Sequence, residues 1–245
     1  MIEFVVCGEG STDLRYDAFN GFDGPLAIAV RNLLDNWYSE EVEMYMVTRP
    51  ELSDANKNDK PKRKAYVRGA KNPYPNTVSI SAFSACLARK AVEHGDACGA
   101  ILFEDMDFSS HENRDKYYRA MIAAMHSGFD SENFRMGVPM VPITRSESWM
   151  LCLIDDEAAQ KSFYENLSGS DNSPNSGKKV LAKMLGCTER ENYSVIRDRV
   201  ESYDWDMLLA PSFIFFKNRL HVVSSTILHK PFPDGLNLEN TKEPN

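Results

Sequence analysis

Short apolar runs alternate with longer amphipathic segments along most of this chain. Four runs, at 2–8, 42–49, 97–103 and 136–144, predict strands because they are short, apolar and bounded by Gly, Pro or acidic residues. Prolines in the last run restrict it to the edge of a sheet or to a strand end. The 3.6-residue spacing of apolar positions predicts helices near 11–38, 81–95, 114–128 and 146–167. This alternation predicts an α/β fold with a mainly parallel sheet.

The pattern divides the chain into three regions. Residues 1–167 form the predicted α/β domain, which contains a polar, basic insertion at 53–76. Residues 168–230 hold three further short helical segments, so we expect a mostly helical C-terminal part. Residues 231–245 read as a flexible, poorly packed tail.

Composition excludes several classes of protein. The 245 residues carry a formal net charge of -8, so the chain as a whole is not a general binder of phosphate backbones. Its five cysteines show no CxxC pair, which favours reduced, mostly buried thiols and a cytoplasmic location over a zinc site. We expect no signal peptide and no membrane helix, because no apolar run approaches about 20 residues.

Acidic residues follow several of the predicted strands. Glu9 comes directly after the first strand, and Asp105 and Asp107 come after the strand that ends AILF. Glu147 begins a helix after the fourth strand. Ligands of open α/β sheets bind outside the carboxyl ends of strands, so we expect Glu9, Asp105 and Asp107 to meet there, with Glu147 on the rim. Crowded carboxylates repel each other, and Mg²⁺ or Mn²⁺ relieves that repulsion by taking oxygen ligands.

The motifs GEGSTD at 8–13 and EDMD at 104–107, each after a strand, resemble the Toprim fold of topoisomerases, primases and OLD-type nucleases. The segments PITRSESWML, SGKKVLAKML and DWDMLLAPSFIFFKNRL are similar to a group of small bacterial Toprim-like proteins related to those nucleases. The resemblance covers about residues 2 to 220. It implies a Toprim-like, Rossmann-like sheet flanked by helices.

The resemblance also implies roles for the acids. Glu9 becomes a catalytic acid/base or metal-positioning group, and Asp105 and Asp107 become ligands of Mg²⁺ or Mn²⁺. Glu147 becomes a ligand of a second metal or a group that orients the nucleophile. Asp13 matches an acid at the start of the first helix, where it can also stabilise the helix N-terminus.

Each of these residues also has a purely structural interpretation. Glu9 and Asp13 can flank a turn and cap a helix, and Asp105 and Asp107 can form a solvated strand end. Glu147 can serve only the N-terminus of its helix.

A dense basic segment lies inside the insertion. It holds the candidate nucleic-acid-binding residues Lys60, Lys62, Arg63, Lys64, Arg68 and Lys71. Such a run is either a solvated loop or localisation-type signal, or, beside a phosphodiester site, a contact for nucleic acid. We expect it near the acidic crevice, because a polyanion needs a local attraction in an acidic protein.

Two functions follow. The first is a divalent-metal-dependent nuclease acting on DNA or RNA. By the resemblance, it would be part of a bacterial phage-defence or toxin-like system and would act with an ABC-type ATPase partner. We also expect that the chain can form a homo-oligomer. The alternative is a non-catalytic Toprim-like adaptor that docks onto such an ATPase, since fold alone does not establish activity.

Overall fold

A four-stranded, all-parallel sheet forms the centre of the protein, with strand order β2-β1-β3-β4. The computed structural model describes residues 1–9, 13–14, 23–58, 74, 76–106, 113–155 and 163–244. The strands are β1 (Ile2–Cys7), β2 (Val42–Met46), β3 (Cys98–Phe103) and β4 (Gly137–Met140). The predicted α/β class, with helices around a parallel sheet and a helical C-terminal part, is confirmed as a Rossmann-like arrangement.

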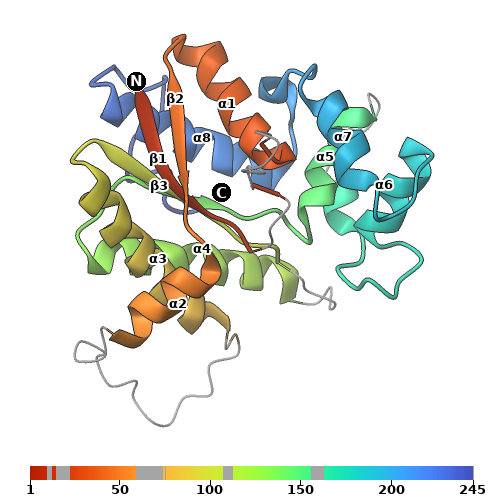
Figure 1. The fold of residues 1–245 in the computed structure, drawn as a ribbon, viewed down its shortest axis with the longest axis horizontal. Helices are drawn as coiled ribbons and strands as arrows, with labels where there is room; N and C mark the ends of the chain where they lie inside the picture. The colour runs from red at the N-terminus through yellow and green to blue at the C-terminus, as the bar shows by residue number, and fades with distance from the viewer. Residues whose placement is uncertain are drawn as a thin grey trace.

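Eight α-helices are seen in the described residues: α1 (Pro25–Tyr38), α2 (Arg49–Asn58), α3 (Asn76–His94), α4 (Arg114–Ser131), α5 (Ser146–Ile154), α6 (Gly177–Leu185), α7 (Asn192–Val200) and α8 (Pro211–Ile227). Short 3₁₀ turns, η3 (Tyr164–Asn166) and η4 (Trp205–Met207), precede α6 and α8. Helices α1 and α8 lie on one face of the sheet and α3 and α4 on the other, while α5, α6 and α7 gather beyond one end of it (Figure 1).

Alternating strand residues build a separate core on each face. Phe4, Val6, Ile101 and Phe103 pack toward α1 and α8, in a core that also holds Trp149 of α5. Their neighbours Val5, Cys7, Ala100 and Leu102 pack toward α3 and α4. A strand buried on both faces reads as a continuous apolar run, which is why β1 and β3 were predictable from sequence.

The proline-containing strand β4 lies at the edge of the sheet, as predicted. It is held in register with β3, and the buried guanidinium of Arg219 on α8 donates to the Gly137 carbonyl of β4 (2.9 Å). The C-terminal part thus shares the core of the α/β domain, because its last helix covers the face formed by β3 and β4.

The described residues 231–244, which we expect to form a flexible and poorly packed tail, are mostly exposed but are anchored at three points. Arg219 donates from Nη1 to the Leu238 carbonyl (2.8 Å), and Thr241 is only 3 % exposed. Arg119 of α4 donates to the Pro244 carbonyl (2.7 Å). These contacts could not be predicted from the local pattern, because the anchoring donors lie in other elements, α4 and α8.

Two boundaries also differ from the prediction. Helix α1 begins at Pro25 after an extended Gly24, and Asp13 and Leu14, which the prediction placed in the first helix, form a bend; residues 15–22 lie outside the described residues. The predicted insertion at 53–76 begins within α2, which continues to Asn58. All five cysteines are unpaired and four of them are buried, as expected. Among the described residues, no helix is long and apolar enough to cross a membrane.

Candidate functional site

Carboxylates from three parts of the chain meet where β1 and β3 end. Glu9 follows β1 by two residues, Asp105 follows β3 by two residues, and Asp13 lies in the bend before α1. Glu147 is in the first turn of α5, which begins after β4. Parallel strands put their carboxyl ends at the same edge, so these acids are gathered there by the topology itself.

Glu9 and Asp105 are in direct contact. The Glu9 carboxylate accepts a hydrogen bond from the backbone N–H of Asp105 (3.1 Å), which ties the end of β1 to the end of β3. Glu9 itself is exposed, so its carboxylate can also meet a ligand from solvent. The predicted proximity of these two acids is therefore seen in the structure.

Asp105 and Asp13 both bind the start of α5 through Ser146. The backbone N–H of Ser146 donates to Asp105 Oδ1 (2.9 Å). The Ser146 hydroxyl donates to Asp13 Oδ1 (2.7 Å). Arg145, the residue that precedes the helix, makes no side-chain capping bond, so Asp105 takes the role of a helix cap from another strand.

Glu147 does not lie on the rim, so that part of the prediction is wrong. Its side chain is fully buried, at 0 % exposure. Gly177, the first residue of α6, lies against it so closely that a Cβ there would come 3.2 Å from Glu147 Cβ. The N-terminus of α6 favours a negative charge in this place, and Lys178 and Arg145 act on the carboxylate in the same sense.

The charged forms of Asp105 and Glu147 are disfavoured at this site. Burial raises the pKa of Asp105 well above its usual range, and the charges of Asp13, Glu147 and Glu9 raise it further. Burial is also the main cause that raises the pKa of Glu147, to which Asp13 adds. Each acid thus acts on the others, so any bound cation would change the protonation of the whole group.

Arg49 is a cation that the sequence analysis did not single out. It begins α2 directly beyond β2 and donates from Nε to the Gly8 carbonyl (3.1 Å) and from Nη2 to the Phe103 carbonyl (2.8 Å). It also forms an ion pair with Glu104 and lies over the ring of Phe83. Arg49 therefore holds the ends of β1 and β3 together beside the acids and neutralises Glu104. The signal in the sequence was its place immediately after a strand, VTRP, at the same sheet edge.

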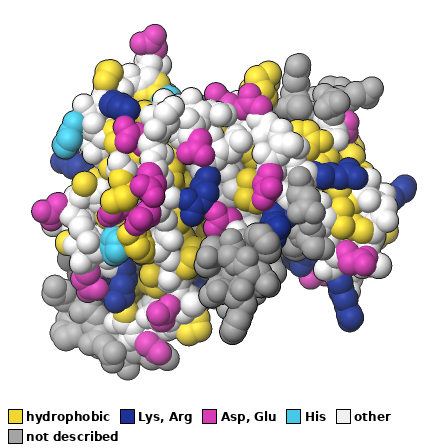
Figure 2. Space-filling model, turned by 45° about the horizontal axis from the view of Figure 1, so that its top comes forward, with side chains coloured by type: hydrophobic (Ala, Val, Ile, Leu, Met, Phe, Trp, Pro, Cys, Tyr) yellow, Lys and Arg dark blue, Asp and Glu magenta, His cyan; other side chains and the backbone are white. Residues whose placement is uncertain are grey.

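Several predicted site residues lie outside the described residues. They are Asp107 and all six members of the basic segment, Lys60, Lys62, Arg63, Lys64, Arg68 and Lys71. On the face shown in Figure 2, the Lys and Arg side chains of the described part are scattered among Asp and Glu. The prediction that the basic segment contacts nucleic acid beside the acids stays a prediction.

The donor set fits a hard divalent cation chemically. It consists of carboxylate oxygens, the preferred ligands of Mg²⁺ and Mn²⁺, and the mutual repulsion at Asp105 is of the kind that a cation relieves. Within the described ranges, no group of three or more His, Cys, Asp or Glu side chains is arranged to hold a metal ion. Glu9, Asp105 and Asp13 each direct one oxygen to an N–H or hydroxyl group of the protein.

Comparison with known proteins gives no further guide to the site, because no protein-family model, curated protein or solved structure matches the chain.

Proposed function

We propose that the protein is a divalent-metal-dependent nuclease that hydrolyses phosphodiester bonds in DNA or RNA. The observation that carries the proposal is the convergence of Glu9, Asp105 and Glu147 at the carboxyl edge of a parallel sheet. These are three of the four acids that the resemblance to Toprim proteins assigns to the metal site. Glu9 and Asp105 are in hydrogen-bond contact there, and the charge of Glu147 acts on Asp105.

The exposure of each acid determines the role that we assign to it. Asp105, with Asp107 by resemblance, would hold Mg²⁺ or Mn²⁺, and the buried Glu147 would add negative charge behind it. A bound cation of this kind supplies Lewis-acid polarisation of a phosphoryl oxygen. Glu9 is the exposed carboxylate of the group, so it is suited to accept a proton from an attacking water at its Oε atoms. Arg49 would keep the two strand ends at a fixed separation through its bonds to Gly8 and Phe103.

The buried charges explain why a cation belongs in the scheme. Burial and the neighbouring acids disfavour the ionised forms of Asp105 and Glu147, as the raised pKa values of both groups indicate. A protonated carboxyl is a poor metal ligand, so cation binding must displace protons from this group. Activity that depends on the cation should therefore increase with pH.

A cleavage assay tests the proposal. Single- and double-stranded DNA and RNA would be incubated with the wild-type protein in Mg²⁺, in Mn²⁺ and in EDTA. Asp105→Asn is the test variant, because the amide keeps an acceptor for the Ser146 N–H and removes the charge. Asp96→Asn is the matched control, since Asp96 is an exposed acid that precedes β3, at the amino ends of the strands and away from the acids.

We expect cation-dependent cleavage that is lost in Asp105→Asn and kept in Asp96→Asn. Cleavage that is equal in both variants would overturn the proposed site. A protein that binds the cation and cuts none of the four substrates would instead favour the adaptor that docks onto an ATPase. The ATPase partner and the role in bacterial defence rest on the resemblance alone and stay predictions.

A further inference from the structure

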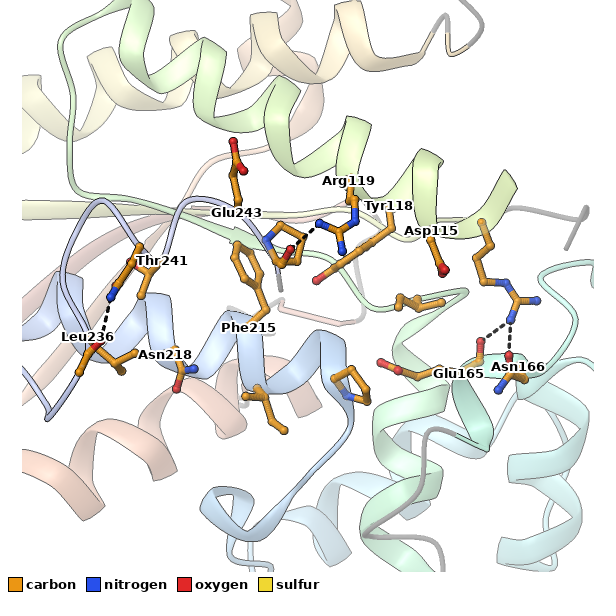
Figure 3. A pocket seen from close by; sticks show the side chains of 17 residues that line it. Asp115, Tyr118, Arg119, Glu165, Asn166, Phe215, Asn218, Leu236, Thr241 and Glu243 are labelled. Carbon is orange, nitrogen blue, oxygen red and sulfur yellow. Dashed lines mark hydrogen bonds between the residues drawn. The ribbon is translucent and has the colours of Figure 1, made fainter. Parts of the chain in front are cut away.

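A second candidate site lies on the other side of the β4–α5 connection. It is a pocket of about 610 Å³, formed by the first turns of α4, the first half of α8, η3 and the C-terminal segment 235–244 (Figure 3). We call it the α4–α8 pocket. Its volume lies within the range of about 300–1,000 Å³ that is usual for small-molecule sites.

The walls combine aromatic and apolar groups with side chains that form hydrogen bonds. Phe215, Ile214 and Ile143 supply apolar surface, and Tyr118 adds a second aromatic ring. Arg114, which is 7 % exposed, holds one wall in place by donating from Nη1 to the Glu165 carbonyl (2.8 Å) and to Asn166 Oδ1 (2.9 Å). The pocket is thus supported by buried polar contacts and is not a gap between loosely packed helices.

Two polar groups in these walls make no hydrogen bond to the residues that the structure describes. The Tyr118 hydroxyl is buried, on a residue only 5 % exposed, and it makes no hydrogen bond to any of the described residues. Figure 3 shows this hydroxyl pointing toward Phe215 across the pocket. The Asn218 amide on α8 likewise makes no hydrogen bond within the described part of the chain. A buried polar group without a partner costs about 1–3 kcal/mol, so a ligand that satisfies it gains affinity.

The charged groups stand at the exposed mouth. Arg119 uses Nη1 to bind the Pro244 carbonyl (2.7 Å), which leaves the other N–H groups of its guanidinium for an anion. Asp115 and Glu243 are exposed acids that also line the pocket. Carboxylates in such positions accept hydrogen bonds from ribose hydroxyls in nucleotide sites.

We propose that the α4–α8 pocket binds a nucleotide. The base lies against Phe215, and its edge is hydrogen-bonded by Asn218, whose amide offers both a donor and an acceptor. The Tyr118 hydroxyl completes the contacts to the base. The ribose and phosphate lie at the mouth, beside the carboxylates and Arg119.

The nucleotide can come from two sources, a free mononucleotide or an unstacked base of a single strand. The geometry allows the second source because the pocket and the acidic site flank one short connection: Ile143 lines the pocket, and Ser146 binds Asp105. Extruding a base from a stack costs a few kcal/mol in a duplex and least in a single strand. Binding in the pocket does not depend on cleavage at the acids.

Calorimetric titration in EDTA tests the proposal without relying on nuclease activity. The probes are AMP, GMP, CMP and UMP, and single-stranded DNA and RNA octamers. The variants are Tyr118→Phe, which keeps the ring and removes only the hydroxyl, and Asn218→Ala. Asn172→Ala is the matched control, because Asn172 is an exposed amide in the loop before α6 and does not line the pocket. Thermal melting of each variant confirms that it is folded.

We expect saturable binding of at least one mononucleotide or octamer, weakened about fivefold or more by Tyr118→Phe and by Asn218→Ala and unchanged by Asn172→Ala. Weakened binding of mononucleotides alone identifies a free nucleotide as the ligand. Weakened binding of octamers identifies a base of the strand. If no probe binds, or if every probe binds both pocket variants as tightly as the wild-type protein, the pocket is not a nucleotide site.

Discussion

The carboxylate of Asp105, at the end of β3, accepts a hydrogen bond from the backbone N–H of Ser146, at the start of α5 (2.9 Å). Asp105 therefore has two structural roles. It caps helix α5, and it is one of the acids at the carboxyl ends of the strands. The structural and functional interpretations of Asp105 are therefore not exclusive. Variants that separate the cap from the charge are needed to tell them apart.

We predict that Asp105→Ala and Asp105→Asn have different effects on stability. The alanine variant loses the acceptor for the Ser146 N–H and should lower the free energy of unfolding by about 1 kcal/mol, as for other lost helix caps. The asparagine variant keeps an acceptor and should be at least as stable as the wild-type protein. Chemical denaturation in EDTA measures both. Equal destabilisation by the two variants would show that the charge itself is required for folding.

A pH series gives a second prediction. The raised pKa of Asp105 means that the folded state holds its proton more tightly than the unfolded state does. Ionisation of this group therefore costs stability as the pH rises above about 4, the ordinary carboxyl value, toward the folded-state pKa. Asp105→Asn removes that cost. Its melting temperature should match that of the wild-type protein near pH 4 and exceed it at pH 8 in EDTA.

We expect the difference between Asp105→Asn and the wild-type protein to grow from pH 4 to pH 8. Asp96→Asn should show no such divergence, because Asp96 is an exposed acid at the amino ends of the strands. A gap between Asp105→Asn and the wild-type protein that stays constant from pH 4 to pH 8 would argue against a raised pKa at Asp105.

Arg49 gives a third prediction. Arg49→Ala removes the bonds to the Gly8 and Phe103 carbonyls and leaves Glu104 without its ion pair, so it should cost about 3 kcal/mol of stability. Arg89→Ala is the control: Arg89 also pairs with an acid, Glu132, but its side chain is 32 % exposed, so the loss should stay below about 1 kcal/mol. Denaturant midpoints compare the two. Equal losses would show that Arg49 does not bind the strand ends tightly.

Much of the fold was predictable because its signals are local. The apolar runs of β1 and β3 predicted two strands of the sheet, and the proline of β4 predicted its position at the edge. The start of α1 was missed, although Pro25 in the first turn is a recognised signal for a helix start. The predicted helix at 146–167 ends at Ile154 as α5, and η3 is a separate turn.

The site was predictable only in part. Glu9 and Asp105 could be placed together because each follows a strand, and parallel strands end at one edge. The burial of Glu147 depends on α6 and Gly177, which lie some thirty residues later in the chain. The roles of Ser146 and Arg49 depend on contacts between distant segments, for which a single sequence carries no direct signal.

The basic segment provides a fourth prediction. Replacing Lys62, Arg63 and Lys64 with alanine should weaken nucleic-acid binding and reduce the slope of log K against log salt by up to about 2.7 for duplex DNA, at about 0.9 for each phosphate contact. The control replaces Lys90, Lys183 and Arg190, which changes the net charge equally at other places. Fluorescence anisotropy across a salt series measures both slopes. If the two triple variants behave alike, the segment is only a solvated loop.

Titration of the wild-type protein with Mn²⁺ at pH 8, followed by calorimetry, tests the central claim most directly. We predict saturable binding of the cation, because its positive charge offsets the burial and the repulsion that raise the pKa of Asp105. The affinity should fall at least tenfold in Asp105→Asn and be unchanged in Asp96→Asn. Wild-type protein that binds no Mn²⁺, or that binds it equally well with Asp105 replaced, would contradict a metal centre among these carboxylates.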